Sequence, residues 1–130
     1  MDNQVHWAES WLGWADGDCA DLVRAVMLER FGLAVPLPSA REAGVRGRDG
    51  QIAAAAEALA QPVDAPLEGD VVVMRAAGRQ RSLGHHVGVF CDVGGEPHVL
   101  HRLAGAGACL HRLDGLRTAG LEATGIYRWR

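Results

Sequence analysis

The chain contains no lysine, so every one of its 13 basic side chains is an arginine. These arginines form no dense stripe and the net charge is −3, which argues against a nucleic-acid partner. Long apolar runs are also missing, since no segment approaches the roughly 20 apolar residues that cross a bilayer. The first ten residues, MDNQVHWAES, lack the basic start and apolar stretch of a signal peptide. We therefore expect synthesis in the cytoplasm, no signal peptide and no membrane insertion.

Cysteines are few, and their spacing excludes two common uses. Cys19, Cys91 and Cys109 form no CxxC pair, and the chain has no HExxH motif. We therefore predict neither a disulfide framework nor a structural metal site, and no cofactor. Cys91 and Cys109 lie in the alternating segments HVGVFCDV and GACLHRL, where a strand would bury each as a small hydrophobic residue.

The pattern of apolar residues changes between the two halves of the chain. The first half predicts helices in VHWAESWLG, CADLVRAVMLERF and QIAAAAEALA, and a further helical piece at the capping box of Ser39 and Glu42. The second half predicts short strands between glycine-containing turns: DVVVMR, HHVGVFCDV, EPHVLHR, ACLHRL and ATGIYRWR. Helices followed by strands indicate one α+β domain over residues 1–130, with N-terminal helices on one face of a C-terminal antiparallel sheet.

The segment GDCADLV places a cysteine at the start of a predicted helix. Asp18 has the position of an N-cap, Cys19 that of the first helical residue, and Gly32 that of the closing left-handed residue. Backbone N–H groups and the positive end of the helix dipole there favour a thiolate and can stabilise an oxyanion. Because a cysteine taken alone is more often a small core residue, Cys19 has to be judged by its partners.

Two histidines are predicted to supply those partners. A two-residue turn at Val93-Gly94 or at Gly94-Gly95 makes HHVGVFCDV and EPHVLHR a hairpin in which His86 and His101 share a face. A three-residue turn would break this pairing. A nucleophilic thiol needs a base and a group that orients the base, so Cys19, His86 and His101 form a candidate catalytic set.

The remaining histidines and the possibility of a metal receive simpler interpretations. His85 falls on the opposite face of the hairpin, and it is interpreted, like His98 and His111, as a strand histidine without a catalytic role. A zinc site built from the candidate catalytic set is an alternative, because these residue types bind zinc, but no ligand spacing supports it.

The segments GDCADLVRAV, LEGDVVVM, HVGVF and HVLH, in this order, resemble the NlpC/P60 cysteine peptidases, in particular the short versions among phage-tail cell-wall hydrolases. The resemblance extends from Trp11 through the last predicted strand. It implies a papain-like α+β fold, with Cys19 as the nucleophile, His86 as the general base and His101 orienting it. It also implies peptidoglycan stem peptides as substrate, cut between γ-D-glutamate and diaminopimelate or lysine, and phage-tail or tail-like particle proteins as partners.

The same resemblance suggests substrate contacts. Trp14 stands in the region where relatives often carry a tyrosine before the cysteine, and the equivalent of Asp18 binds a free substrate amine in some relatives. Ala20 and Asp21 replace the family's common Ser-Gly, which removes a hydroxyl and adds a carboxylate.

The loop RAAGRQRSLG precedes His86, and its arginines are interpreted either as solvated or as a rim that attracts substrate carboxylates. Arg81 is the rim residue that we select as a substrate contact, beside Arg75 and Arg79. Two other functions stay open: a tail component without turnover, and a thiol amidase or acyltransferase.

Overall fold

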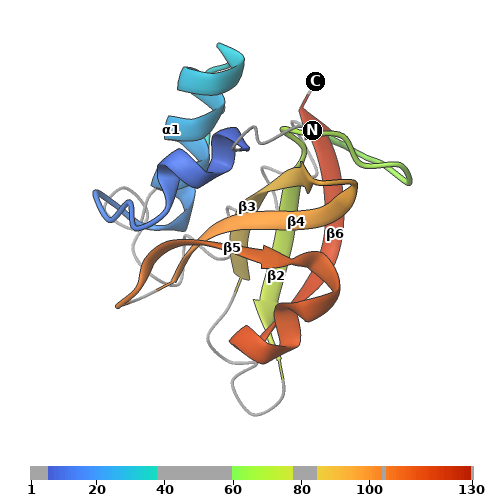
Figure 1. Cartoon of the computed structure of the whole chain (residues 1–130). Helices are drawn as coiled ribbons and strands as arrows, with labels where there is room; N and C mark the ends of the chain where they lie inside the picture. Colours follow the sequence, from blue (N-terminus) through green and yellow to red (C-terminus); the bar gives the residue numbers. More distant parts are fainter. Residues whose placement is uncertain (1–5, 38–59, 78–84, 104, 130) are drawn as a thin grey trace.

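The computed structural model describes residues 6–37, 60–77, 85–103 and 105–129. Six strands form one antiparallel sheet in the spatial order β1-β6-β2-β3-β4-β5 (Figure 1). The strands are β1 (Ala60–Pro62), β2 (Val71–Ala76), β3 (His85–Val93), β4 (Glu96–Leu103), β5 (Gly107–Arg112) and β6 (Leu121–Trp129). The predicted strands of the second half are therefore confirmed, because their β-branched alternation and glycine turns are local signals.

These elements show that one prediction was wrong. Over the residues that the structure describes, the chain does not have the predicted papain-like α+β arrangement of N-terminal helices packed on a C-terminal sheet. The architecture is predominantly antiparallel sheet, and α1 (Cys19–Phe31) is the one α-helix within the described residues. The first predicted helix is instead the 3-10 segment η1 (Trp7–Trp11), and a second 3-10 segment, η3 (Leu113–Ala119), connects β5 to β6.

The 3-10 geometry of η1 has a local cause. His6 caps the segment, and Gly13 follows with a φ of 84°, so little chain remains for α-helical propagation after a costly nucleus. Its hydrogen bonds, such as Leu12 N–H to Glu9 O at 3.3 Å, span three residues. The helical pieces predicted from Ser39 and in QIAAAAEALA lie outside the described residues, apart from Ala60, which belongs to β1.

The caps of α1 agree with the sequence prediction. Asp18 is the N-cap, Cys19 is the first helical residue, and Gly32 closes the helix in the left-handed conformation with a φ of 67°. The buried face of α1 consists of Cys19, Ala20, Leu22, Val23, Val26 and Met27. Figure 1 shows α1 on one side of the sheet, where it packs mainly on β3 and β4.

Each face of the sheet carries its own apolar cluster. The first cluster joins α1 to the residues of one face: Val71, Val73, Val87, Val89, Cys91, Leu100 and Ala108. The second cluster, on the other face, consists of Val72, Met74, Phe90, Val99, Leu116 and Leu121. The run VVVM in β2 is thus buried on both faces, since alternate residues enter different clusters. The second face is therefore also covered, which the sequence prediction of helices on one face did not include.

Among the described residues, no helix has both the length and the apolar character that are needed to cross a membrane.

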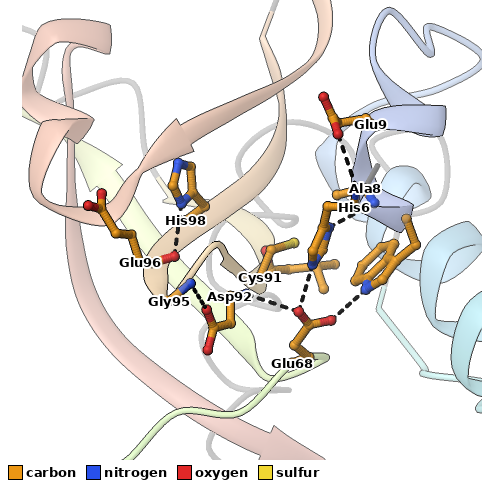
Figure 2. Close-up of polar contacts among 11 residues, drawn as sticks. His6, Ala8, Glu9, Glu68, Cys91, Asp92, Gly95, Glu96 and His98 are labelled. Atoms are coloured by element: carbon orange, nitrogen blue, oxygen red, sulfur yellow. Dashed lines mark hydrogen bonds and ion pairs between the residues drawn. The ribbon is translucent and has the colours of Figure 1, made fainter. Parts of the chain in front are cut away.

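Glu68, in the loop before β2, ties the N-terminal segment to the sheet (Figure 2). Its carboxylate lies 2.6 Å from His6 Nε2, and it accepts hydrogen bonds from Trp7 Nε1 and from Asp92 N–H in β3. Burial works to raise the pKa of Glu68, but the hydrogen bonds from His6 and Trp7 and the charge of His6 together lower it.

Glu68→Gln should reduce the acid sensitivity of folding. A carboxylate with a lowered folded-state pKa adds stability above its unfolded pKa of about 4.3, and this stability is lost as the pH falls through the folded value. Because the Glu68 side chain is 32% exposed, the difference should not exceed about 1 kcal/mol. Urea unfolding at neutral and acid pH measures it, with exposed Glu29→Gln as the control; equal pH dependence in Glu68→Gln and wild type would contradict the assignment.

Candidate active site

Three histidines form a hydrogen-bonded chain across three adjacent strands. His86 Nε2 on β3 lies 3.4 Å from His101 Nδ1 on β4, and His101 Nε2 lies 2.8 Å from His111 Nδ1 on β5. The rings of His86 and His101 meet edge to face at a centroid distance of 5.5 Å. The first two members are predicted site residues, and the structure brings them together as the hairpin prediction requires.

The strand register explains why these side chains meet. The β3–β4 hairpin turns at Gly94-Gly95, with φ angles of 62° and 84°, so Val93 pairs with Glu96 and Gly88 pairs with His101. His86 is therefore the diagonal neighbour of His101, which was one of the two predicted pairings. On the other side His101 pairs with Cys109, and His111 is again a diagonal neighbour.

Gly88 provides the space in which His101 lies. A Cβ atom at Gly88 would come within 2.6 Å of Val99 Cγ1, 2.8 Å of Leu100 O and 3.0 Å of His101 Cβ. Two of these neighbours are backbone or Cβ atoms, which cannot rotate away. The glycine in HVG therefore has a structural reason: it lets His101 on β4 approach the strand that carries His86.

His101 is fully buried and remains neutral. Burial is the main cause that lowers its pKa to about 3, and the nearby charges of His86 and His111 lower it further. A neutral imidazole has one N–H donor and one acceptor nitrogen, so His101 donates to one neighbouring histidine and accepts from the other.

The three rings are not arranged as a metal centre. Because His101 directs its two ring nitrogens at different histidines, the three side chains do not converge on one point. Across the portions of the chain that the structure describes, no group of three or more His, Cys, Asp or Glu side chains is placed to hold a metal ion.

Cys19 begins α1 at the end of the sheet where β4 ends and β5 starts. The preceding loop is fixed there, because Ala108 N–H donates to Trp14 O at 2.8 Å and Gly13 N–H donates to Ala108 O at 2.9 Å. Arg102 Nε also donates to Gly17 O at 3.1 Å. The helix N-terminus, the start of β3 and the end of β4 thus lie at the same end of the sheet.

The thiol and the histidines approach that end from different layers. Cys19 is 3% exposed and packs in the first apolar cluster with Val87 and Val89. Alternation along β3 and β4 assigns His86 and His101 to the other face, with Phe90 and Val99 of the second cluster. Cys19 and His86 thus lie at the same end of the sheet but belong to opposite layers.

The two acidic residues beside Cys19 form a capping box. Asp18 Oδ1 accepts from Asp21 N–H, and Asp21 Oδ2 accepts from Asp18 N–H, each at 3.0 Å. Asp21 also pairs with Arg24, whose guanidinium donates to Leu37 O at 2.9 Å. The Asp21 carboxylate thus stabilises the start of the helix. Ala20 is fully buried and takes part in the core.

The predicted substrate contacts have different positions. Trp14 is partly buried against the first cluster, and its carbonyl anchors the loop to β5. Arg75 projects from β2 and pairs with Glu122 on β6. Arg81 and Arg79 lie outside the described residues.

The contact of His111 with His101 was not predicted from the sequence, where His111 was interpreted as a strand histidine without a catalytic role. The contact depends on the register between β4 and β5, and the sequence analysis did not assign that register. His98 has no part in the chain of histidines, since its Nδ1 lies 2.9 Å from Glu96 O.

The other two cysteines are placed as predicted, in strands. Cys91 is fully buried, and this burial is the main cause that raises its pKa to about 12. Cys109 is half-buried on β5, where it pairs with His101. Cys109 therefore provides a thiol near the histidines against which the reactivity of Cys19 can be compared.

Searches against known proteins give no family for the chain. No protein-family model matches it, and no curated protein matches its sequence. The resemblance to NlpC/P60 peptidases therefore stays a prediction from the four sequence motifs.

His101→Asn should flatten the acid end of the stability profile. A histidine with a lowered folded-state pKa adds stability above its unfolded value of about 6.5, and this is lost as the pH falls toward 3. Between pH 6.5 and 4 wild type should lose roughly 3 kcal/mol through this group. Urea unfolding across that range measures the loss, with His98→Asn as the control on the same strand. An unchanged slope in His101→Asn would show that His101 is not held neutral.

Proposed function

We propose that the chain is a cysteine peptidase of the NlpC/P60 type that hydrolyses peptidoglycan stem peptides. The observation that carries the proposal is the hydrogen bond between His86 and His101, formed at the same end of the sheet as Cys19 at the N-terminus of α1. The family resemblance selects the bond between γ-D-glutamate and diaminopimelate as the substrate. On the same resemblance, the proposal includes that the protein acts at the bacterial cell wall as part of a phage tail or tail-like particle.

In this reaction Cys19 transfers its proton to His86 and the thiolate attacks the scissile carbonyl carbon. Backbone N–H groups at the start of α1 stabilise the oxyanion. The protonated His86 then donates its proton to the leaving amine, and an acyl-enzyme remains. Water hydrolyses the acyl-enzyme with His86 as the base, which regenerates the thiol.

The proposed role of His101 follows from its neutrality. A neutral ring can accept the Nε2–H of His86 both before and after His86 takes the proton from Cys19, because that N–H is present in both states. In this way His101 holds the ring of His86 in the tautomer whose Nδ1 takes the proton from the thiol. The predicted contacts Trp14 and Asp18, which come from the resemblance, and Arg81, which comes from the charge of its loop, belong to substrate binding in this proposal. Asp18 already uses Oδ1 for the helix cap.

A second candidate is a tail component that has this architecture but no turnover. The observation in its favour is the 3% exposure of Cys19 within an apolar cluster, which is also the environment of a cysteine that serves only as a core residue.

Cys19→Ala should abolish cleavage, whereas Cys109→Ala should leave kcat/KM within about twofold of wild type, because a substitution outside the reacting groups has a small effect. Mass spectrometry of defined peptidoglycan fragments, both free and glycan-linked stem peptides, identifies the bond that is cut. Products from Cys19→Ala at the wild-type rate would contradict the nucleophile assignment.

Alkylation separates the two candidate functions. With a small thiol reagent, Cys19 should react faster at neutral pH than Cys109, although it is less exposed, because a thiolate is the reactive form. Absence of cleavage together with slower alkylation of Cys19 than of Cys109 would favour the component without turnover.

A further inference from the structure

His111 is the outer member of the histidine chain. It lies on β5, at an edge of the sheet, and is partly exposed, whereas His101 on the neighbouring strand is fully buried. The 2.8 Å separation between His101 Nε2 and His111 Nδ1 is shorter than the 3.4 Å separation between His101 and His86. The better-formed contact of His101 is therefore the one with His111.

Two proton arrangements satisfy both contacts when the three rings are neutral. In the first, each ring carries its proton on Nε2, so His86 donates to His101 and His101 donates to His111. In the second, each ring carries its proton on Nδ1, and the donation runs from His111 toward His86. The two arrangements differ at Nδ1 of His86, which is unprotonated only in the first.

The proposed function requires the first arrangement, since Nδ1 of His86 must accept the thiol proton. Its Nε2–H then needs an acceptor, which is Nδ1 of His101. That nitrogen is an acceptor only while the His101 proton resides on Nε2, and a buried N–H there must itself have a partner. His111 Nδ1 is the atom that provides it.

We propose that His111 is a positioning residue that selects the Nε2–H tautomer of His101 and, through it, the orientation of His86. This inference rests on the proposed function for the direction of proton donation. His111 acts through two other side chains, which distinguishes it from the reacting residues.

The tautomer of His101 can be read directly in the full chain by long-range proton–nitrogen correlation NMR with labelled histidine at neutral pH. Wild type should show an unprotonated Nδ1 and a protonated Nε2 in His101. A His101 ring protonated on Nδ1 would overturn the proposal, and this measurement needs no variant and no substrate.

Two substitutions test whether His111 sets that tautomer. His111→Asn retains an acceptor, because Oδ1 of asparagine can take the place of Nδ1, whereas His111→Leu removes it. In His111→Leu the His101 signals should shift toward the Nδ1–H form, and in His111→Asn they should stay as in wild type. If the tautomer is unchanged in a folded His111→Leu protein, the proposal is wrong.

Kinetic measurements test whether the tautomer of His101 affects the reaction. His111→Leu should lower kcat about tenfold to a hundredfold with little change in KM, and it should slow alkylation of Cys19, while His111→Asn should recover most of both. Equal kcat values in wild type and His111→Leu would contradict the positioning role.

Failure of the proposed function gives a different result. If no peptide is cut but the His101 tautomer and Cys19 alkylation respond to His111→Leu as described, the positioning role stands and the substrate assignment fails. If cleavage depends on Cys19 and His86 but neither readout responds to His111→Leu, the peptidase assignment stands and the role of His111 fails.

Discussion

The register of β3, β4 and β5 is the constraint on which the candidate site depends. Because Gly88 pairs with His101 and His101 pairs with Cys109, the three strands present one histidine each in a diagonal row. A shift of either hairpin by one residue would move a histidine to the other face and separate the rings. The two-glycine turn and the missing side chain at Gly88 hold this arrangement, so residues without functional groups determine the geometry of those that have them.

Burial determines the protonation state of His101, the central residue of the three histidines. In water an imidazole gains a proton near neutral pH, but the fully buried ring of His101 stays neutral far below that range. A neutral central ring can pass a preference for one tautomer from one neighbour to the other, which a protonated ring with two donors cannot do. The burial of His101 is therefore as important to the candidate site as the register of the strands.

The sequence predicted those parts of the structure that have local signals. The cap at Asp18, the start of the helix at Cys19 and the alternating strands were all recognisable, and the pairing of His86 with His101 followed from one glycine turn. Contacts between distant segments had no such signal, as with Glu68, which meets His6 from 62 residues away. The prediction of an α-helix in the first segment was wrong because apolar spacing does not separate α from 3-10 geometry in the short stretch Trp7–Trp11. The sequence likewise did not indicate the partners of the Asp21 carboxylate, which are the backbone N–H of Asp18 and the guanidinium of Arg24.

The central claim is that the histidine row on one face of the sheet acts on the Cys19 thiol from the other layer. The most direct measurement is the ultraviolet absorbance of the Cys19 thiolate as a function of pH. The thiolate signal is the difference in absorbance between wild type and Cys19→Ala. The same difference is then measured in a second pair of proteins, both of which carry His86→Leu. The account predicts a thiolate signal at neutral pH that disappears when His86 is replaced, because an imidazolium partner stabilises the thiolate. Superimposable titration curves with and without His86 would show that the thiol and the histidines do not interact.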